Sequence, residues 1–268
     1  MKKSSPLAVA ILFLFLMAPP AGQAAEEITV ETDNFSLLGE LPEEKLEEWG
    51  SLLEERRREI ADQLSFYYLG NWEKRCQVRF TASPKEFTVK SGAPGWAKGW
   101  SRVEYKKKKE GVEIKGRMIW VRSDFPGSEM EPLFSHEIAH LLYREFLEFP
   151  EGVPLWLDEG VAVWAEARNR PQYERTIRMA IEKEAFYPLT DFFNLREYPK
   201  DKTLFYAQAS SIIQFLVSEY GAHEFQRFSR LIRDGVSMSE SMEKVYQANV
   251  AEPEEFETRW KEWVAAQE

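Results

Sequence analysis

The chain has 268 residues, of which 44% are hydrophobic and 30% are charged, and its formal net charge is −10 at pH 7. This length and composition suit one large domain, or two closely packed subdomains, with a substantial core. The acidic balance argues against nucleic acid as a partner. The single cysteine, Cys76, excludes an internal disulfide, so packing and any bound metal must hold the fold together.

The first 24 residues have the pattern of a secretory signal peptide. Lys2 and Lys3 are followed by an apolar run over residues 7–18 and by small residues at 21–25. This run is shorter than the roughly 20 residues that a membrane-spanning helix needs, so we expect cleavage after Ala24 and no stable membrane anchor. We therefore expect export to the periplasm or outside the cell, with 33 basic and 45 acidic residues in the mature chain.

The segment after the signal peptide begins with short alternating patterns. Residues 28–38 predict a strand and a turn, and Cys76 begins an alternation of apolar and polar residues that predicts a half-buried strand. Between them, apolar residues at helical spacing predict a helix that begins near Pro42 and ends by Gly70. Cys76 is interpreted as a small hydrophobic residue of the core.

Residues 77–122 have a period close to two, which predicts the main sheet. Apolar pairs on either side of Glu110-Gly111 predict a hairpin, and residues 106–109 at its tip are all lysine. On an acidic chain this tip is most simply a solubilising loop, although four lysines could also bind an anionic surface. Residues 116–122 form the last predicted strand before the segment that carries the chemistry.

The segment Ser135-His136-Glu137-Ile138-Ala139-His140 places two imidazoles and one carboxylate within a helix predicted over residues 131–146. Residues four apart share one helix face, so His136 and His140 can bind one metal ion. Glu137 is turned away from the metal itself but stays close to water at the metal, where it can act as a general base. Two ordinary helix histidines are the alternative, but the chain places two of its three histidines here.

Glu159 is the predicted third ligand. It lies beyond His140 in the segment Trp156-Leu157-Asp158-Glu159-Gly160-Val161-Ala162, which predicts a second helix after breaks at Pro150, Gly152 and Pro154. Two imidazoles leave a tetrahedral zinc short of a ligand, and a carboxylate from a second helix would complete the site with one position open for water. The predicted cofactor is therefore one Zn²⁺ ion.

The HExxH motif, the eighteen residues after it and a glutamate within W-L-x-E-G-x-A resemble the gluzincin zinc metallopeptidases, most of all the small bacterial peptidase MA-like proteins. The resemblance implies His136, His140 and Glu159 as zinc ligands and Glu137 as the catalytic base. In the related aminopeptidases, a Gly-Ala-Met-Glu-Asn-like segment binds the free amino terminus of the substrate. No such segment precedes the motif here, so an endopeptidase or a narrow processing activity is expected.

The resemblance also implies roles outside the motif. The strand over residues 116–122 would lie along the cleft and pair with an extended substrate peptide through its free edge. Tyr206 resembles the aminopeptidase tyrosine that donates to the oxyanion, which one metal ion leaves only half stabilised. The chain after Arg170 is predicted to be helical, with breaks near Pro188 and Pro199.

Two further residues are interpreted from their spacing. Glu166 lies two helical turns beyond Glu159, where its carboxylate can accept the second N–H of a metal-bound histidine. A solvated surface acid is the alternative for Glu166. His223 has no partner at ligand spacing and is interpreted as a surface residue.

Together these patterns predict an α+β fold, in which a small twisted sheet with an N-terminal helix packs against a helical zinc-binding half, and the resemblance implies that this fold is zincin-like. Residues 1–24 would be the signal peptide, 25–128 the N-terminal α/β part and 129–268 the helical part. The predicted function is an exported zinc metallopeptidase with a peptide or protein substrate. Two alternatives stay open: a zinc-bound scaffold that binds peptide without cleaving it, and a hydrolase of cell-wall peptide amides. Intact Glu137 argues against the scaffold, since an idle site needs no base.

Overall fold

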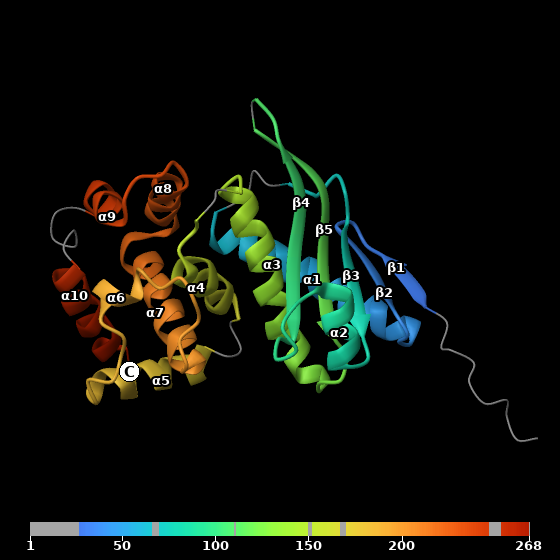
Figure 1. Cartoon of the computed structure of the whole chain (residues 1–268), viewed down its shortest axis with the longest axis horizontal. Coiled ribbons are helices and arrows are strands. Elements are labelled where there is room, and N and C mark those ends of the chain that lie inside the picture. The colour runs from blue at the N-terminus through green and yellow to red at the C-terminus, as the bar shows by residue number, and fades with distance from the viewer. Residues whose placement is uncertain are drawn as a thin grey trace, which may run out of the picture.

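The structure is a computed structural model that describes residues 27–65, 70–109, 111–149, 152–166, 170–246 and 253–267. This part of the chain combines a five-stranded sheet with helices, and the helices make up one whole side of the molecule (Figure 1). The predicted α+β fold is confirmed. The predicted signal peptide lies outside the described residues, and within the described ranges no helix has the length and apolar character needed to cross a membrane.

The sheet mixes parallel and antiparallel pairs. Its strands are β1 (Ile28–Glu31), β2 (Phe35–Gly39), β3 (Cys76–Thr81), β4 (Gly99–Lys107) and β5 (Val112–Arg122). Their order across the sheet is β1-β2-β3-β5-β4. β2, β3 and β5 are parallel, whereas β1 and β4 run antiparallel to their neighbours. The edge strand on the side of the metal-binding motif is therefore β4.

The prediction that residues 116–122 form a free edge along the cleft is wrong. These residues belong to β5, which pairs with β3 on one side and with β4 on the other. The hairpin turns β5 back along β4, and β3 then takes the other side of β5 by parallel pairing. This long-range pairing, which leaves no local signal in the sequence, moves the edge to β4.

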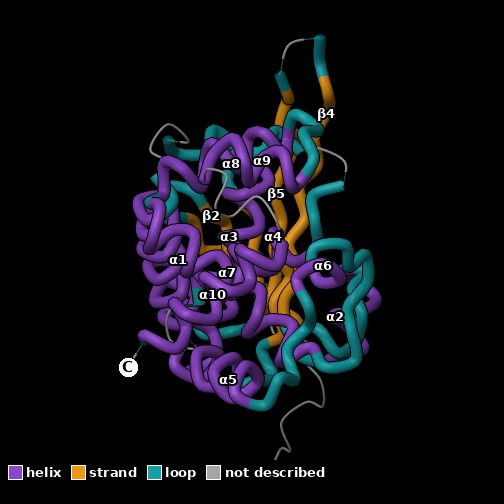
Figure 2. Tube along the Cα trace, turned by 90° about the vertical axis from the view of Figure 1, so that its left-hand side faces the viewer, coloured by secondary structure: helices purple, strands orange, loops and turns teal. Residues whose placement is uncertain are grey.

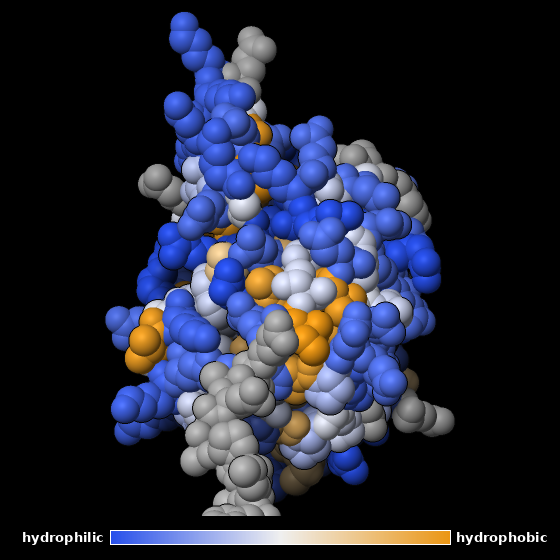
Figure 3. All heavy atoms as spheres, turned by 90° about the vertical axis from the view of Figure 1, so that its right-hand side faces the viewer, coloured by the Kyte–Doolittle hydropathy of each residue, from blue (hydrophilic) through white to orange (hydrophobic). Residues whose placement is uncertain are grey.

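The β4–β5 hairpin forms as predicted, with Tyr105 opposite Ile114 and Lys107 opposite Val112. A bulge after Glu104 shifts the register, and such irregularities increase the local twist. The hairpin projects from the body of the protein, and Figure 3 shows an almost wholly hydrophilic surface over the projection. A hydrophilic surface is compatible with both interpretations of the lysine-rich tip, a solvated loop or a site for an anionic surface.

The helices differ from the prediction in one place. They are α1 (Glu43–Gln63), α2 (Pro84–Ser91), α3 (Met130–Phe146), α4 (Leu155–Ala165), α5 (Arg170–Glu182), α6 (Leu189–Phe192), α7 (Lys202–Tyr220), α8 (Ala222–Arg233), α9 (Met238–Tyr246) and α10 (Pro253–Ala266). The region predicted as continuous sheet thus contains α2. Its ends carry ordinary helix signals: Ser83 caps the first turn, and Gly92 follows the last residue with a φ of 74°.

The core lies on both faces of the sheet. On one face, α1 and α3 bury the apolar side chains of β2, β3 and β5, among which Cys76 and Val78 are fully buried. On the other face, α2 covers a small cluster around Phe87 and Trp120. The main cluster continues without a break into the helical half, which lies in front of the sheet in Figure 2.

The second helix of the motif, α4, lies at the centre of the helical half. All its residues from Trp156 to Ala165 are buried. Gly160 allows α7 to approach closely, because a β-carbon at residue 160 would lie 2.9 Å from both the Ala209 carbonyl oxygen and Ile213 Cγ1. The close contact between α4 and α7 brings Glu159 and Tyr206 to the same region of the protein.

Candidate metal centre

The two histidines of the motif project from α3 toward one point. His136 and His140 are one helical turn apart, and their Nε2 atoms are 3.1 Å from each other. α3 is held between α1, α4 and the edge strand β4, and most of its apolar side chains are buried, including Phe134, Ile138 and Leu141. Burial on several sides fixes the rotation of α3 and so fixes the direction of both imidazoles.

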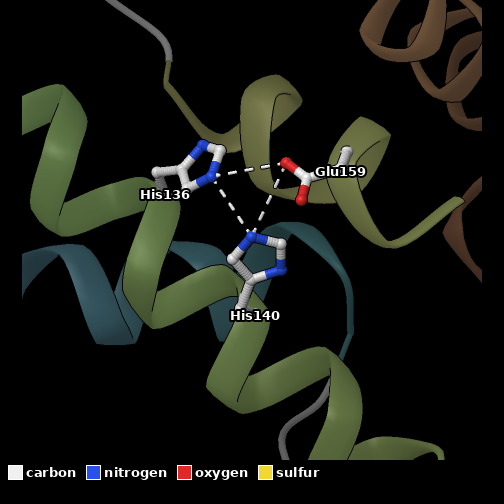
Figure 4. Close-up of side chains that lie close together, drawn as sticks. All are labelled: His136, His140 and Glu159. Carbon is white, nitrogen blue, oxygen red and sulfur yellow. Dashed lines mark hydrogen bonds and ion pairs between the residues drawn. The ribbon is translucent and has the colours of Figure 1, made fainter. Parts of the chain in front are cut away.

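Glu159 completes the cluster from α4 (Figure 4). Its Oε2 atom is 3.6 Å from His136 Nε2 and 3.8 Å from His140 Nε2. Atoms that bind a tetrahedral zinc at about 2.0–2.1 Å are about 3.3–3.4 Å from one another, so the three atoms need only small shifts to hold an ion. Among the described residues no hydrogen bond satisfies Glu159 Oε2, although this oxygen is buried. An unpaired buried carboxylate oxygen is costly, and a cation at this point would remove the cost.

The structure places Glu166 beside His136. Glu166 Oε1 is 2.7 Å from His136 Nδ1, the contact that the spacing predicted. Glu166 does not extend the face of α4, however, because it follows the last helical residue, Ala165. Burial lowers the pKa of His136, but the hydrogen bond with Glu166 and the charges of Glu159 and Glu137 outweigh it and raise the pKa to about 9. The contact orients the imidazole so that Nε2 faces the cluster.

His140 has an acidic neighbour that the sequence analysis missed. Asp158 Oδ1 is 3.3 Å from His140 Nδ1, close enough for strong electrostatic attraction. Arg144 pairs with the same carboxylate at 2.5 Å. Burial raises the pKa of Asp158, but His140 and Arg144 outweigh it and hold that pKa well below its usual range. The sequence does contain a signal for Asp158, because an acidic residue is unusual within the otherwise apolar run of α4.

Glu137 lies next to the cluster and against the sheet edge. It is 5% exposed and lines the same cavities as His136. Gly99, the first residue of β4, leaves room for it, since a β-carbon at residue 99 would stand 2.6 Å from Glu137 Oε1. The position of the predicted base therefore depends on a glycine that lies far away in the sequence.

Two tyrosines face the cluster from the helical half. Tyr206, in the second turn of α7, lines the cavities with His136 and Glu137, as the prediction of an oxyanion donor requires. Tyr198, in the loop before α7, was not predicted, and its hydroxyl donates to Glu159 Oε1 at 2.5 Å. Burial and the charge of Glu159 raise the pKa of both hydroxyls well above the usual range, so both stay protonated and can donate.

A cleft runs past the cluster, from the segment before β4 to residues 100–103 of β4. At one end, a cavity of about 620 Å³ is lined by residues 96–99 together with Glu137 and Tyr206. In the middle, about 100 Å³ of space lies beside His140 and Glu159. At the other end, a cavity of about 430 Å³ is lined by residues 100–103 of β4 and by side chains such as Phe149. His223 lies outside this cleft as an exposed residue of α8, as predicted.

The fold and the site define a metallopeptidase-like protein: an α+β, zincin-like arrangement in which an HExxH helix and a glutamate from the next helix can hold a metal ion. A sequence model of the Peptidase MA superfamily matches residues 131–266, about half of the chain. The chain belongs to the Peptidase MA superfamily. This membership confirms the resemblance seen in the motif and supports a peptidase-type hydrolase. Comparison with curated proteins gives no match.

Proposed function

We propose that the protein is an exported zinc endopeptidase in which His136, His140 and Glu159 hold one zinc ion. The observation that carries the proposal is the convergence of three ligand atoms, one of them a buried carboxylate oxygen that no described residue satisfies. Two imidazole nitrogens and one carboxylate oxygen are the donor set of catalytic zinc sites that keep a position open. Zinc in this site supplies a Lewis acid that polarises a carbonyl group and acidifies water.

Residues around the cluster carry out the proton transfers and stabilise the oxyanion. Glu137 accepts a proton from the attacking water and passes it to the leaving amine, which a carboxylate beside the site can do in both directions. Tyr206 donates a hydrogen bond to the oxyanion that forms on the scissile carbonyl. The raised pKa of Tyr206 supports this role, since a hydroxyl that stays protonated remains a donor. Glu166 orients His136 from the outer side.

The shape of the cleft supports cleavage within a chain. Space lies on both sides of the cluster, beside residues 96–99 on one side and along residues 100–103 of β4 on the other, so an extended peptide has room before and after the bond that is cut. β4 is an edge strand, and the backbone groups of an edge can recognise a peptide irrespective of its sequence. The sequence also lacks the amine-binding segment expected of an aminopeptidase.

We also propose that the reaction takes place in the periplasm or outside the cell. The pattern of residues 1–24 supports export, with cleavage of the signal peptide and action in the periplasm or outside the cell. Residues 25–128 and 129–268 would act as two parts of one catalytic unit, and the substrate would be a peptide or protein rather than nucleic acid. The acidic charge of the chain supports the last point.

The test is digestion of a peptide library whose amino and carboxyl termini are blocked. Zinc-loaded protein is expected to cut internal bonds, and the Glu137→Gln variant is expected to keep zinc but lose nearly all cleavage, because an amide cannot accept the proton from water. Zinc binding without cleavage of any peptide would favour the scaffold. Cleavage of cell-wall fragments alone would favour the hydrolase of cell-wall amides.

A further inference from the structure

Tyr198 belongs to none of the motifs, yet it makes the shortest contact to the cluster. Its hydroxyl donates to Glu159 Oε1 at 2.5 Å, while Glu159 Oε2 faces the two histidines. Within the described part of the chain, no other hydrogen bond reaches this carboxylate. One oxygen of Glu159, Oε1, thus accepts the hydrogen bond from Tyr198, and the other, Oε2, faces the point where the two imidazoles converge.

The ring of Tyr198 is itself held in place. Pro199 follows it and restricts its backbone to extended conformations. The ring packs edge-on against Trp96, from the segment before β4, and against Phe205 of α7, with 5.9 Å between ring centroids in both cases. Lys202 Nζ lies 3.2 Å from the centre of the Trp96 ring and 5.4 Å from that of Tyr198. Contacts from both walls of the cleft therefore fix the hydroxyl.

We propose that Tyr198 is a positioning residue for the metal, whose hydroxyl fixes Glu159 as a ligand through one oxygen. The inference rests on the proposed function, because it takes Glu159 as a zinc ligand. The last torsion of a glutamate side chain is broad, so a carboxylate without a donor can rotate and present either oxygen. The hydroxyl selects one orientation before the ion arrives. Outer contacts of this kind change metal affinity by about 10–100-fold when they are removed.

The test measures zinc affinity by competition with a chelating indicator, with zinc alone as the ligand. Tyr198→Phe keeps the ring and its packing and removes only the hydroxyl, so the zinc Kd is expected to rise about 10–100-fold. Tyr187→Phe is the matched control, because that hydroxyl contacts the Asp201 carbonyl at 3.4 Å and does not touch Glu159. Its zinc Kd is expected to equal that of the wild type. Thermal unfolding of the metal-free proteins is expected to be the same for all three.

A double-mutant cycle then separates positioning from a general effect on the fold. If Tyr198 acts through Glu159, Tyr198→Phe has no further effect on zinc affinity in a Glu159→Ala background. An equal loss in both backgrounds overturns the proposal, as does an unchanged zinc Kd in Tyr198→Phe. Lower stability of metal-free Tyr198→Phe with wild-type zinc affinity also overturns it. If the wild-type protein itself binds no zinc, the proposed function falls with it.

Discussion

Gly99 of β4 lies directly against the carboxylate of Glu137, and a β-carbon at residue 99 would stand 2.6 Å from Glu137 Oε1. The same β-carbon would stand 2.8 Å from Leu133 Cδ1, also on α3. A glycine at this position therefore allows the sheet edge and the metal helix to approach each other. A larger residue at position 99 is therefore expected to displace the carboxylate of Glu137, the proposed base.

Gly99→Ala is expected to lower kcat/KM by about 10–100-fold, because a base displaced by about 1 Å loses its alignment with the attacking water. Zinc content is expected to stay at the wild-type level, since the β-carbon meets Glu137 rather than the ligands. Gly116→Ala on the neighbouring strand is the control, because a β-carbon there meets nothing within 4 Å. Equal activity of the two variants would contradict the role of Gly99.

The metal content is expected to depend on the three converging residues His136, His140 and Glu159. Purified protein is expected to hold about one zinc ion per molecule, and His136→Ala or Glu159→Ala is expected to lose most of it, because each removes one of three protein ligands. Elemental analysis after dialysis measures the content. Full occupancy in Glu159→Ala would remove Glu159 from the ligand set and leave the cluster without its third donor.

Tyr206→Phe tests the proposed oxyanion donor. The hydrogen bond forms mainly in the transition state, so kcat is expected to fall by about 10²–10³-fold while KM changes little. Zinc content and thermal stability are expected to match the wild type, because the ring and its packing remain. A drop in stability with unchanged kcat would identify a structural hydrogen bond, and Tyr198 would then be the hydroxyl to examine as the donor.

Glu166→Ala tests the outer contact of His136. Loss of the acceptor frees the imidazole to rotate, so the zinc Kd is expected to rise about 10–100-fold. Glu174→Ala on α5 is a suitable control, because that carboxylate contacts Gln214 at 3.4 Å and lines a different pocket. If Glu166→Ala binds zinc as tightly as the control, the 2.7 Å contact with His136 contributes nothing to metal binding.

Gly160→Ala tests the approach of α4 to α7. Alanine favours a helix by about 1 kcal/mol over glycine, but overpacking against a fixed backbone costs about 1–3 kcal/mol. The obstacle is the Ala209 carbonyl at 2.9 Å, which cannot move without shifting α7, so net destabilisation is expected. The midpoint of thermal unfolding should fall by about 2–4 °C for each kcal/mol lost. Gly127→Ala, where the β-carbon meets nothing within 4 Å, should leave it unchanged.

The cluster could be predicted from the sequence because its geometry is local. His136 and His140 share a helix face by spacing alone, and Glu159 lies on the next helix along the chain. Glu166 was predicted to contact a histidine, and it does so from just beyond the end of α4 rather than from its face. The spacing of two helical turns from Glu159 still places the Glu166 carboxylate on the side of α4 that faces His136.

The residues that sequence reasoning missed come from distant segments. Gly99 reaches Glu137 only because β4 is the edge of the sheet, and that edge is decided by the pairing of β3 with β5. Tyr198 reaches Glu159 across 39 positions of the chain, from a loop with no regular pattern. Neither contact is marked by a periodicity or a motif in the sequence, so only the tertiary structure reveals it.

Cys76 can report on the opening of the core between the sheet and the helices that cover it. Its thiol is fully buried in β3, and burial raises the pKa of that thiol well above its usual range. Its side chain lies in the core between the sheet and the helices α1 and α3, so a reagent reaches the sulfur only after these helices move away from the sheet. Because the thiolate is the reactive form, the rate of alkylation measures how often this core opens, and the core includes the packing of α3, which carries His136 and His140. Because Cys76 is the single cysteine of the chain and is buried, the folded protein offers no accessible thiol through which two copies could become cross-linked.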